Sequence, residues 1–299
     1  MKIRLIGLGK MGRSIALNLK DHNHEVLGYD IKESARDKFA ELKLDVVHDL
    51  PSLLKRDEKE RAVVLLFVPN EAVDSVLEKL IPILNKDDIV IDGGNSNFNI
   101  SIKRYHLLKG KGIDFVDLGT SGGISGARYG VCLMAGGSKE VVTYLEPMFK
   151  DISQENGYAY VGKPGAGHFV KMVHIGIEYG MMQAISEGFS LLEASPFELD
   201  YEEISRAWSN GSLIESALIK HAHNAFAKDS HLNDLEGKID DTGEGMWMIE
   251  EALKYKVSLP VITQSLYARY KSKDNRLFGE KVVAAMRKEF GGHAVYRKK

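Results

Sequence analysis

Cysteine is almost absent from this chain, which has one, Cys132, among its 299 residues. A single cysteine excludes an internal disulfide bond and a metal site built from cysteine ligands. Because Cys132 lies in the apolar run 131–134, we expect a buried side chain in a core strand rather than a catalytic thiol.

Long apolar runs and an excess of basic residues are lacking as well. No stretch approaches the about 18 apolar residues that suggest a membrane-spanning helix, and no leader-like segment precedes the strand expected from Lys2. We therefore expect a cytoplasmic protein that does not bind membranes. The 40 basic and 42 acidic residues leave a formal charge of −2, so few cations are available to neutralise phosphates and no nucleic-acid partner is expected.

A glycine-rich turn follows the first expected strand. The expected strand Ile3-Arg4-Leu5-Ile6 leads into a GxGxxG motif at 7–12, and a second expected strand, 25–29, ends at Asp30. Glycines in such a turn let the backbone approach a pyrophosphate, which the next helix N-terminus stabilises. In this context the motif predicts a bound dinucleotide; a glycine turn without a ligand is the alternative. Because Asp30 would accept hydrogen bonds from ribose hydroxyls and repel a 2′-phosphate, we expect NAD rather than NADP. The cofactor residues predicted here are Gly7, Leu8, Gly9, Lys10, Met11, Gly12 and Asp30.

Further apolar runs at 61–68 and 88–92 are typical of parallel strands covered on both faces, and helical patterns lie between them. This alternation predicts an α/β fold with a doubly wound sheet, in which ligands bind beyond the carboxyl ends of the strands. Two loops at those ends are therefore expected to hold cofactor or substrate, namely Val68-Pro69-Asn70 and Gly93-Gly94-Asn95-Ser96.

A third loop follows the strand expected at 115–119 and contains Ser121-Gly122-Gly123. Backbone N–H groups and a hydroxyl without bulky neighbours form a suitable cradle for a carboxylate. A flexible glycine turn is the alternative interpretation.

One long helix is expected from just after Pro164 to about Ala194, because apolar residues recur there at helical spacing. Lys171, His174 and Glu178 stand at i, i+3 and i+7, which places an amine, an imidazole and a carboxylate in one row about 10 Å long. The alternative is that Lys171 and Glu178 are solvated surface charges and His174 is a core histidine. Three ionisable groups in so apolar a helix favour a catalytic or binding role instead.

The chain beyond this point carries only helical patterns, at 201–209, 212–227, 247–254, 261–270 and 277–289. These patterns predict an all-α domain. Metal binding is not expected, since the spacing of His221 and His223 places them on different helix faces.

Four motifs in one order carry a family resemblance, namely 7–12, Asp92-Gly93-Gly94-Asn95-Ser96, Thr120-Ser121-Gly122-Gly123 and 167–174. Together they resemble the β-hydroxyacid dehydrogenase superfamily. Residues 165–180 and the ending Phe290-Gly291-Gly292-His293 are similar to the short form of decarboxylating 6-phosphogluconate dehydrogenase. The resemblance implies a Rossmann-type NAD-binding domain at 1–166 and a helical domain at 167–299 for substrate binding and dimerisation.

The resemblance also implies roles for residues. Lys171 would be the general base and Glu178 the general acid of an NAD-dependent oxidative decarboxylation. A homodimer, or a tetramer, would have its C-terminal tail complete the neighbour's site. The substrate residues implied are Asn95, Ser121, Gly122, Gly123, His174, Tyr179, Arg287 and His293, with Asn95 also near NAD.

Three positions depart from the family pattern. Ile175 stands where most members have asparagine, and Met246 and Met248 flank Trp247 where the family places a basic residue and a threonine toward the substrate phosphate. Loss of that basic residue and threonine weakens binding of an anionic group, and Arg276 or Arg269 would compensate for the loss. The departures suggest another C6 group, such as the sulfonate of 6-deoxy-6-sulfogluconate, beside 6-phosphogluconate itself. A dehydrogenase without decarboxylation and an inactive NAD-binding protein are the remaining alternatives.

Overall fold

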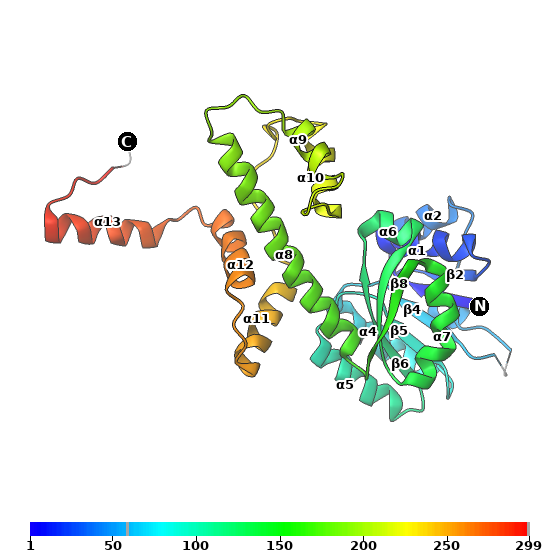
Figure 1. Ribbon diagram of the computed structural model, residues 1–299. Coiled ribbons are helices and arrows are strands. Elements are labelled where there is room, and N and C mark those ends of the chain that lie inside the picture. The colour runs from blue at the N-terminus through cyan, green and yellow to red at the C-terminus, as the bar shows by residue number, and fades with distance from the viewer. Residues whose placement is uncertain (58–59, 298–299) are drawn as a thin grey trace. The chain divides into compact units, whose positions relative to one another are not determined.

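The computed structural model describes residues 1–57 and 60–297 and divides into two compact units, Met1–Ile175 and Gly176–Lys299. The division falls inside one long helix, α8 (Ala166–Glu193), which is labelled in Figure 1. The boundary that the family resemblance implies, between residues 166 and 167, lies in the first turn of this helix. The helix expected from the apolar spacing is confirmed, and its first ten residues belong to the first unit.

The first unit is built on an eight-stranded sheet with the order β3-β2-β1-β4-β5-β6-β7-β8. Neighbouring strands pair in parallel, except that β6 and β7 are antiparallel. The doubly wound α/β prediction is thus confirmed, with two reversed strands at one edge. The strands are β1 (Lys2–Ile6), β2 (Glu25–Tyr29), β3 (Asp45–Val46), β4 (Val63–Leu66), β5 (Ile89–Asp92), β6 (Asp114–Ser121), β7 (Val131–Gly136) and β8 (Ser153–Gly162).

Helices cover both faces of this sheet, which is why its central strands read as continuous apolar runs (Figure 1). Alternate residues of β4 enter two separate cores: Val63 and Leu65 pack with α1 and α7, and Val64 and Leu66 pack with α4 and α5. The helices of this unit are α1 (Lys10–Asp21), α2 (Glu33–Ala40), α3 (Leu50–Leu53), α4 (Asn70–Leu80), the 3-10 turn η1 (Ile81–Ile83), α5 (Phe98–Lys109), α6 (Gly123–Tyr129) and α7 (Lys139–Ile152).

Three features of the first unit differ from the sequence expectation. The Ser-Gly-Gly segment is not a free turn, because α6 begins at Gly123 directly after it. Strand β8 extends over ten residues that carry no clear apolar alternation. The Cys132 side chain is exposed, so the expectation of burial was wrong: strand alternation directs it away from the core that holds Val131 and Leu133.

The second unit is all-helical in its described part, as predicted, and contains the rest of α8 followed by α9 (Tyr201–Trp208), α10 (Ala217–Phe226), α11 (Glu244–Tyr255), α12 (Pro260–Lys273) and α13 (Phe278–Gly291). Two starts are capped by side chains: Asp200 accepts a hydrogen bond from Glu203 N (3.0 Å) and Ser216 from Ile219 N (3.3 Å). Within the described residues, no helix combines the length and apolar character needed to cross a membrane.

Helix α13 has no buried residue, although its sequence is amphipathic. Phe278, Val282, Met286 and Phe290 recur at intervals of four, and their exposed fractions run from 39% to 76%. Such a stripe normally packs against a protein surface.

Candidate active site

The glycine-rich turn between β1 and α1 has the geometry of a phosphate-binding loop. Gly7 adopts φ +97°, and a Cβ there would lie 2.3 Å from the Phe67 carbonyl oxygen, so a side chain cannot fit. A Cβ on Gly12 would meet Gly7 O at 2.0 Å, which explains the third glycine as a packing requirement. A Cβ on Gly9 would meet nothing within 4 Å. The turn therefore presents open space at Gly9, where a ligand can approach the backbone.

Asp30 lies at the end of β2 and holds this turn. Its Oδ2 accepts a hydrogen bond from Leu8 N at 2.7 Å, and its Oδ1 accepts one from Lys32 N at 2.9 Å. An ionised carboxylate offers about four acceptor positions, so two stay available for ribose hydroxyls.

A cavity of about 580 Å³ opens over the turn, which is a size typical of cofactor sites. Met11 and Gly12 do not line it; Met11 packs against the core of the first unit. Five cationic side chains surround the cavity: Lys10, Arg13, Lys32, Lys38 and Lys79. The predicted cofactor residues that line it are Gly7, Leu8, Gly9, Lys10, Asp30, Val68 and Pro69.

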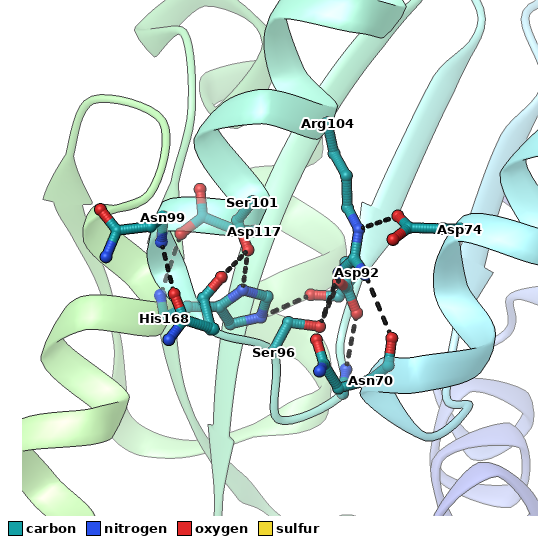
Figure 2. A network of polar contacts seen from close by, with 11 residues as sticks. Asn70, Asp74, Asp92, Ser96, Asn99, Ser101, Arg104, Asp117 and His168 are labelled. Atoms are coloured by element: carbon teal, nitrogen blue, oxygen red, sulfur yellow. Dashed lines mark hydrogen bonds and ion pairs between the residues drawn. The ribbon is translucent and has the colours of Figure 1, made fainter. Parts of the chain in front are cut away.

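A buried polar network connects the loop after β5 to neighbouring helices (Figure 2). Asp92 Oδ2 accepts hydrogen bonds from Ser96 Oγ (2.7 Å) and Arg104 Nη1 (3.2 Å), and its Oδ1 accepts one from Gly94 N (3.2 Å). Arg104 also donates to the Asn70 carbonyl at 3.1 Å. These bonds hold the loop that contains the exposed Asn95 next to the start of α4.

Helix α8 carries Lys171, which is 5% exposed and lies against the sheet. A Cβ on Gly119 of β6 would be 2.7 Å from the Lys171 Cβ, so glycine is required there for the helix to approach. One turn further, His174 Nε2 lies 3.2 Å from Ser121 Oγ. The first unit thus places His174 against Ser121, with Lys171 one turn earlier on the same helix.

Gly122 and Gly123 stand at the N-terminus of α6 with φ values of +122° and +62°. A Cβ on Gly123 would meet nothing within 4 Å. Open space therefore lies beside the backbone here, at the place where the sequence predicts a carboxylate cradle.

In the second unit, Tyr179 is 5% exposed, and its ring is covered by the Arg269 guanidinium at 3.6 Å. The Tyr179 hydroxyl donates to Asp241 Oδ1 and lies near Thr242 Oγ1, both at 3.2 Å. Arg269 is 8% exposed and donates to the Asp240 carbonyl. The stacking of Arg269 on Tyr179 is a cation–π interaction within the second unit.

The other predicted substrate residues of this unit are more varied. Met248 is buried, and a Cβ on Gly176 would lie 2.1 Å from its sulfur, so Met248 packs directly on α8. Met246 is 42% exposed. The Arg276 side chain is 88% exposed and pairs with Asp274 in the same turn. Within one chain, Arg287 on α13 and His293 beyond it are exposed as well.

Sequence reasoning missed Asp92, Asp117 and His168 as parts of the site, and it gave Arg269 only a secondary place. Asp92 and Asp117 are charged residues within strands otherwise buried on both faces, and each is 0% exposed. A charge in such a strand needs compensating partners, which is the signal that would have identified them. No group of three or more His, Cys, Asp or Glu residues in the described chain is arranged to hold a metal ion.

Comparison with known proteins agrees with this arrangement. Residues 2–163 match the NAD-binding domain of 6-phosphogluconate dehydrogenase, and residues 167–297 match the C-terminal domain of the same enzyme. YqeC of Bacillus subtilis, a candidate 6-phosphogluconate dehydrogenase, is 46% identical over 298 residues, covering 100% of both chains. The NAD(+)-dependent, decarboxylating 6-phosphogluconate dehydrogenase of Haloferax volcanii is 36% identical and covers 100% of this chain and 99% of its own.

Longer relatives and solved structures match too. The sheep decarboxylating enzyme is 38% identical over 298 residues, which are 93% of this chain and 62% of the sheep protein. The Plasmodium falciparum 6-phosphogluconate dehydrogenase superposes with a TM-score of 0.83 at 28% identity, covering 100% of this chain and 66% of that one. A Mycobacterium tuberculosis 3-hydroxyisobutyrate dehydrogenase shares the fold, with a TM-score of 0.71 at 18% identity and coverage of 91% and 94%. Two domain matches in order and full-length relatives place this chain in the 6-phosphogluconate dehydrogenase family, as a short form.

Proposed function

We propose that this protein catalyses the NAD-dependent oxidative decarboxylation of a C6-substituted gluconate, with 6-phosphogluconate giving ribulose 5-phosphate and CO₂. The observation that carries the proposal is the position of Lys171. Its side chain is buried against β6, where Gly119 leaves room for the helix to approach, and it lies one helical turn before the His174–Ser121 contact. A buried amine beside hydroxyl and imidazole groups is suited to accept a proton from a substrate hydroxyl.

The cavity over the glycine-rich turn fits NAD. Gly9 leaves space for a pyrophosphate, and Asp30 keeps acceptor positions for the adenosine ribose. NAD, when bound, accepts the hydride that leaves C3 of the substrate. The preference for NAD over NADP rests on the negative charge of Asp30, although the five surrounding cations reduce the repulsion of a 2′-phosphate.

The protein's own residues would then move the protons. Lys171 accepts the proton of the C3 hydroxyl as that carbon is oxidised to a ketone. The C1 carboxylate leaves as CO₂, its bonding electrons pass to the C3 oxygen, and protonated Lys171 stabilises that oxygen. The C3 oxygen takes its proton back from Lys171, which gives an enediol. Glu178, two turns along α8, then donates a proton to the former C2, which becomes C1 of the ketose, while Lys171 accepts the C3 hydroxyl proton again. The Ser121-Gly122-Gly123 cradle and Asn95 would hold the carboxylate and hydroxyls.

A second candidate substrate differs at C6. Met246 and Met248 carry no charge, and Met248 is occupied in packing against Gly176, so neither can bind a phosphate as the family's basic residue and threonine would. Arg269, stacked on Tyr179, remains as a buried cation for a C6 anion. One cation with apolar neighbours fits the lower charge of a sulfonate, as in 6-deoxy-6-sulfogluconate.

Steady-state kinetics with both substrates, and with NAD and NADP, test this choice. Released CO₂ separates the reaction from a plain hydroxyacid oxidation. A double variant, Met246→Lys with Met248→Thr, restores the residue types that the family has at these positions. We expect it to raise kcat/KM for 6-phosphogluconate and to change kcat/KM for the sulfonate less. A wild-type preference for the phosphate ester would reject the sulfonate alternative.

The Lys171→Ala variant tests the catalytic assignment itself. Turnover should be lost while NADH binding, measured by fluorescence, persists. Unchanged turnover would refute the role of Lys171.

A homodimer, or a tetramer, is part of the same proposal. The apolar stripe of α13 is uncovered within one chain, and Arg287 lies on the same helix. A second copy would cover the stripe and could receive Arg287 and His293 in its site. Sedimentation analysis tests the assembly. The cytoplasmic location stays a prediction.

A further inference from the structure

The first turn of α8 is seated by a side chain from another element. Asp117 of β6 is 0% exposed, and both of its carboxylate oxygens accept backbone hydrogen bonds. Oδ1 accepts from Gly165 N at 2.7 Å and Oδ2 from His168 N at 2.9 Å (Figure 2). The N-terminal N–H groups of a helix lack intrahelical partners, so Asp117 serves as a cap supplied from the sheet. Its charge is also favourable at the positive end of the helix dipole.

The backbone around this cap is packed too tightly to shift. A Cβ on Gly167 would lie 2.2 Å from the Asp117 carbonyl oxygen, and a Cβ on Gly136 would lie 2.7 Å from Asp117 Oδ1. Glycines on both elements therefore allow the helix start to contact β6 and β7 directly. Because Lys171 follows one turn later on the same rigid helix, the place of this turn determines the place of its amine.

His168 connects the same turn to the loop that contains Asn95. It is 2% exposed, and its Nε2 lies 3.1 Å from the Asp92 carbonyl oxygen while its Nδ1 lies 2.7 Å from Ser101 Oγ. The carbonyl can only accept, so Nε2 carries a proton and donates to it. Asp92 in turn holds its own loop through Ser96 and Arg104.

We propose that Asp117 and His168 are positioning residues, which hold Lys171 and the Asn95 loop in one fixed arrangement. The proposal rests on the proposed function for its catalytic meaning, but the seating of α8 can be measured without turnover. Neither residue contacts a reacting atom in this account. Their effect passes through the helix and the loop that they join.

Asp117→Asn is the first test, because asparagine keeps the shape but directs an NH₂ group at one of the two N–H donors. Asp114→Asn on the same strand is the matched control: Asp114 is also buried and binds Arg61 and Lys109, at 2.6 and 3.2 Å, away from α8. We expect Asp117→Asn to lower kcat about tenfold or more, since small misplacements of a catalytic group are costly. The KM for NAD should change less than about twofold, and Asp114→Asn should keep the wild-type kcat.

Two readouts separate positioning from general destabilisation. The pH profile of kcat should shift in Asp117→Asn, because the base experiences a changed environment, and should not shift in Asp114→Asn. Amide hydrogen exchange measured over residues 165–175 should become faster in Asp117→Asn alone, with or without a substrate.

His168 supplies a graded test. His168→Leu removes both ring contacts and should lower kcat about tenfold or more, whereas His168→Gln, which can still donate to the Asp92 carbonyl, should recover part of the loss.

The outcomes distinguish this inference from the proposed function. If wild-type protein turns over no C6-substituted gluconate, the proposed function fails, and hydrogen exchange still decides whether Asp117 seats the helix. If turnover is present and Asp117→Asn matches Asp114→Asn in kcat, pH profile and exchange, the positioning role is overturned. Equal loss in His168→Gln and His168→Leu would overturn the part assigned to the Asp92 contact.

Discussion

The contact between Gly119 and Lys171 yields a quantitative prediction. In Gly119→Ala the new methyl group would lie 2.7 Å from the Lys171 Cβ and 2.7 Å from the Gly167 carbonyl oxygen. Ordinary contacts begin at 3.4 Å, so α8 and β6 must separate by about 0.7 Å. The backbone atom cannot rotate away, and the first turn of α8 is already confined by Asp117.

Both stability and rate should respond. Overpacking of this kind costs about 1–3 kcal/mol of unfolding free energy. A displacement of about 0.7 Å at the base should lower kcat about 10- to 100-fold. NADH affinity should be retained, because the cavity over Gly9 lies at another part of the sheet edge and none of its lining residues contacts Gly119.

The assay compares kcat, NADH binding and thermal unfolding with those of Gly110→Ala. Gly110 lies in the same unit with φ −62°, and its added methyl group would meet only ordinary contacts of 3.4 Å or more. That control should behave like wild type. A Gly119→Ala enzyme with wild-type kcat would refute the claim that close approach of α8 to β6 positions the catalytic amine.

Three further outcomes are expected. Asp30→Ser should lower kcat/KM for NAD at least about tenfold without creating an efficient NADP enzyme, because Leu8 N and the glycine turn lose their acceptor; an unchanged value for NAD would contradict this. Arg269→Lys should raise the KM for an anionic C6 substrate about tenfold, since lysine lacks the planar group that stacks on Tyr179, and an unaltered KM would remove Arg269 from the site. Tyr158→Phe should raise the unfolding free energy by about 1 kcal/mol at pH 7, because the Tyr158 hydroxyl is buried without a hydrogen-bond partner in the described structure. Burial raises the pKa of Tyr158 to about 12, so this tyrosine ionises first in the unfolded chain, and the stability of the wild type should fall as pH rises from 10 toward 12. Denaturation measured at those pH values should show a smaller fall in Tyr158→Phe.

The local motifs were predictable because their geometry depends on neighbours in the chain. The glycine spacing at 7–12 specifies a tight turn, and the end of a parallel strand at Asp30 places a carboxylate beside it. Likewise the row of Lys171, His174 and Glu178 follows from helical periodicity alone, and the structure has one helix over all three. The doubly wound sheet follows from the alternation of buried strands with helices.

Other features needed the tertiary structure, because their causes are contacts between distant segments. Strand β8 forms by pairing with β7 despite weak alternation, and α6 begins within the Ser-Gly-Gly segment, where the sequence pattern did not indicate a helix. Exposure of Cys132 depends on which face of β7 is covered.

The sequence by itself determined which chemical groups this protein possesses and how they are spaced along a turn and a helix, since those spacings are set by bond geometry and short-range hydrogen bonds. Only the tertiary structure decided how they are held. Asp117, His168 and Asp92 lie 25 to 76 residues apart in the chain and meet because strand pairing and the docking of α8 bring three elements together. Desolvation makes each of those buried polar groups require a partner, and no local pattern specifies which distant partner it will find.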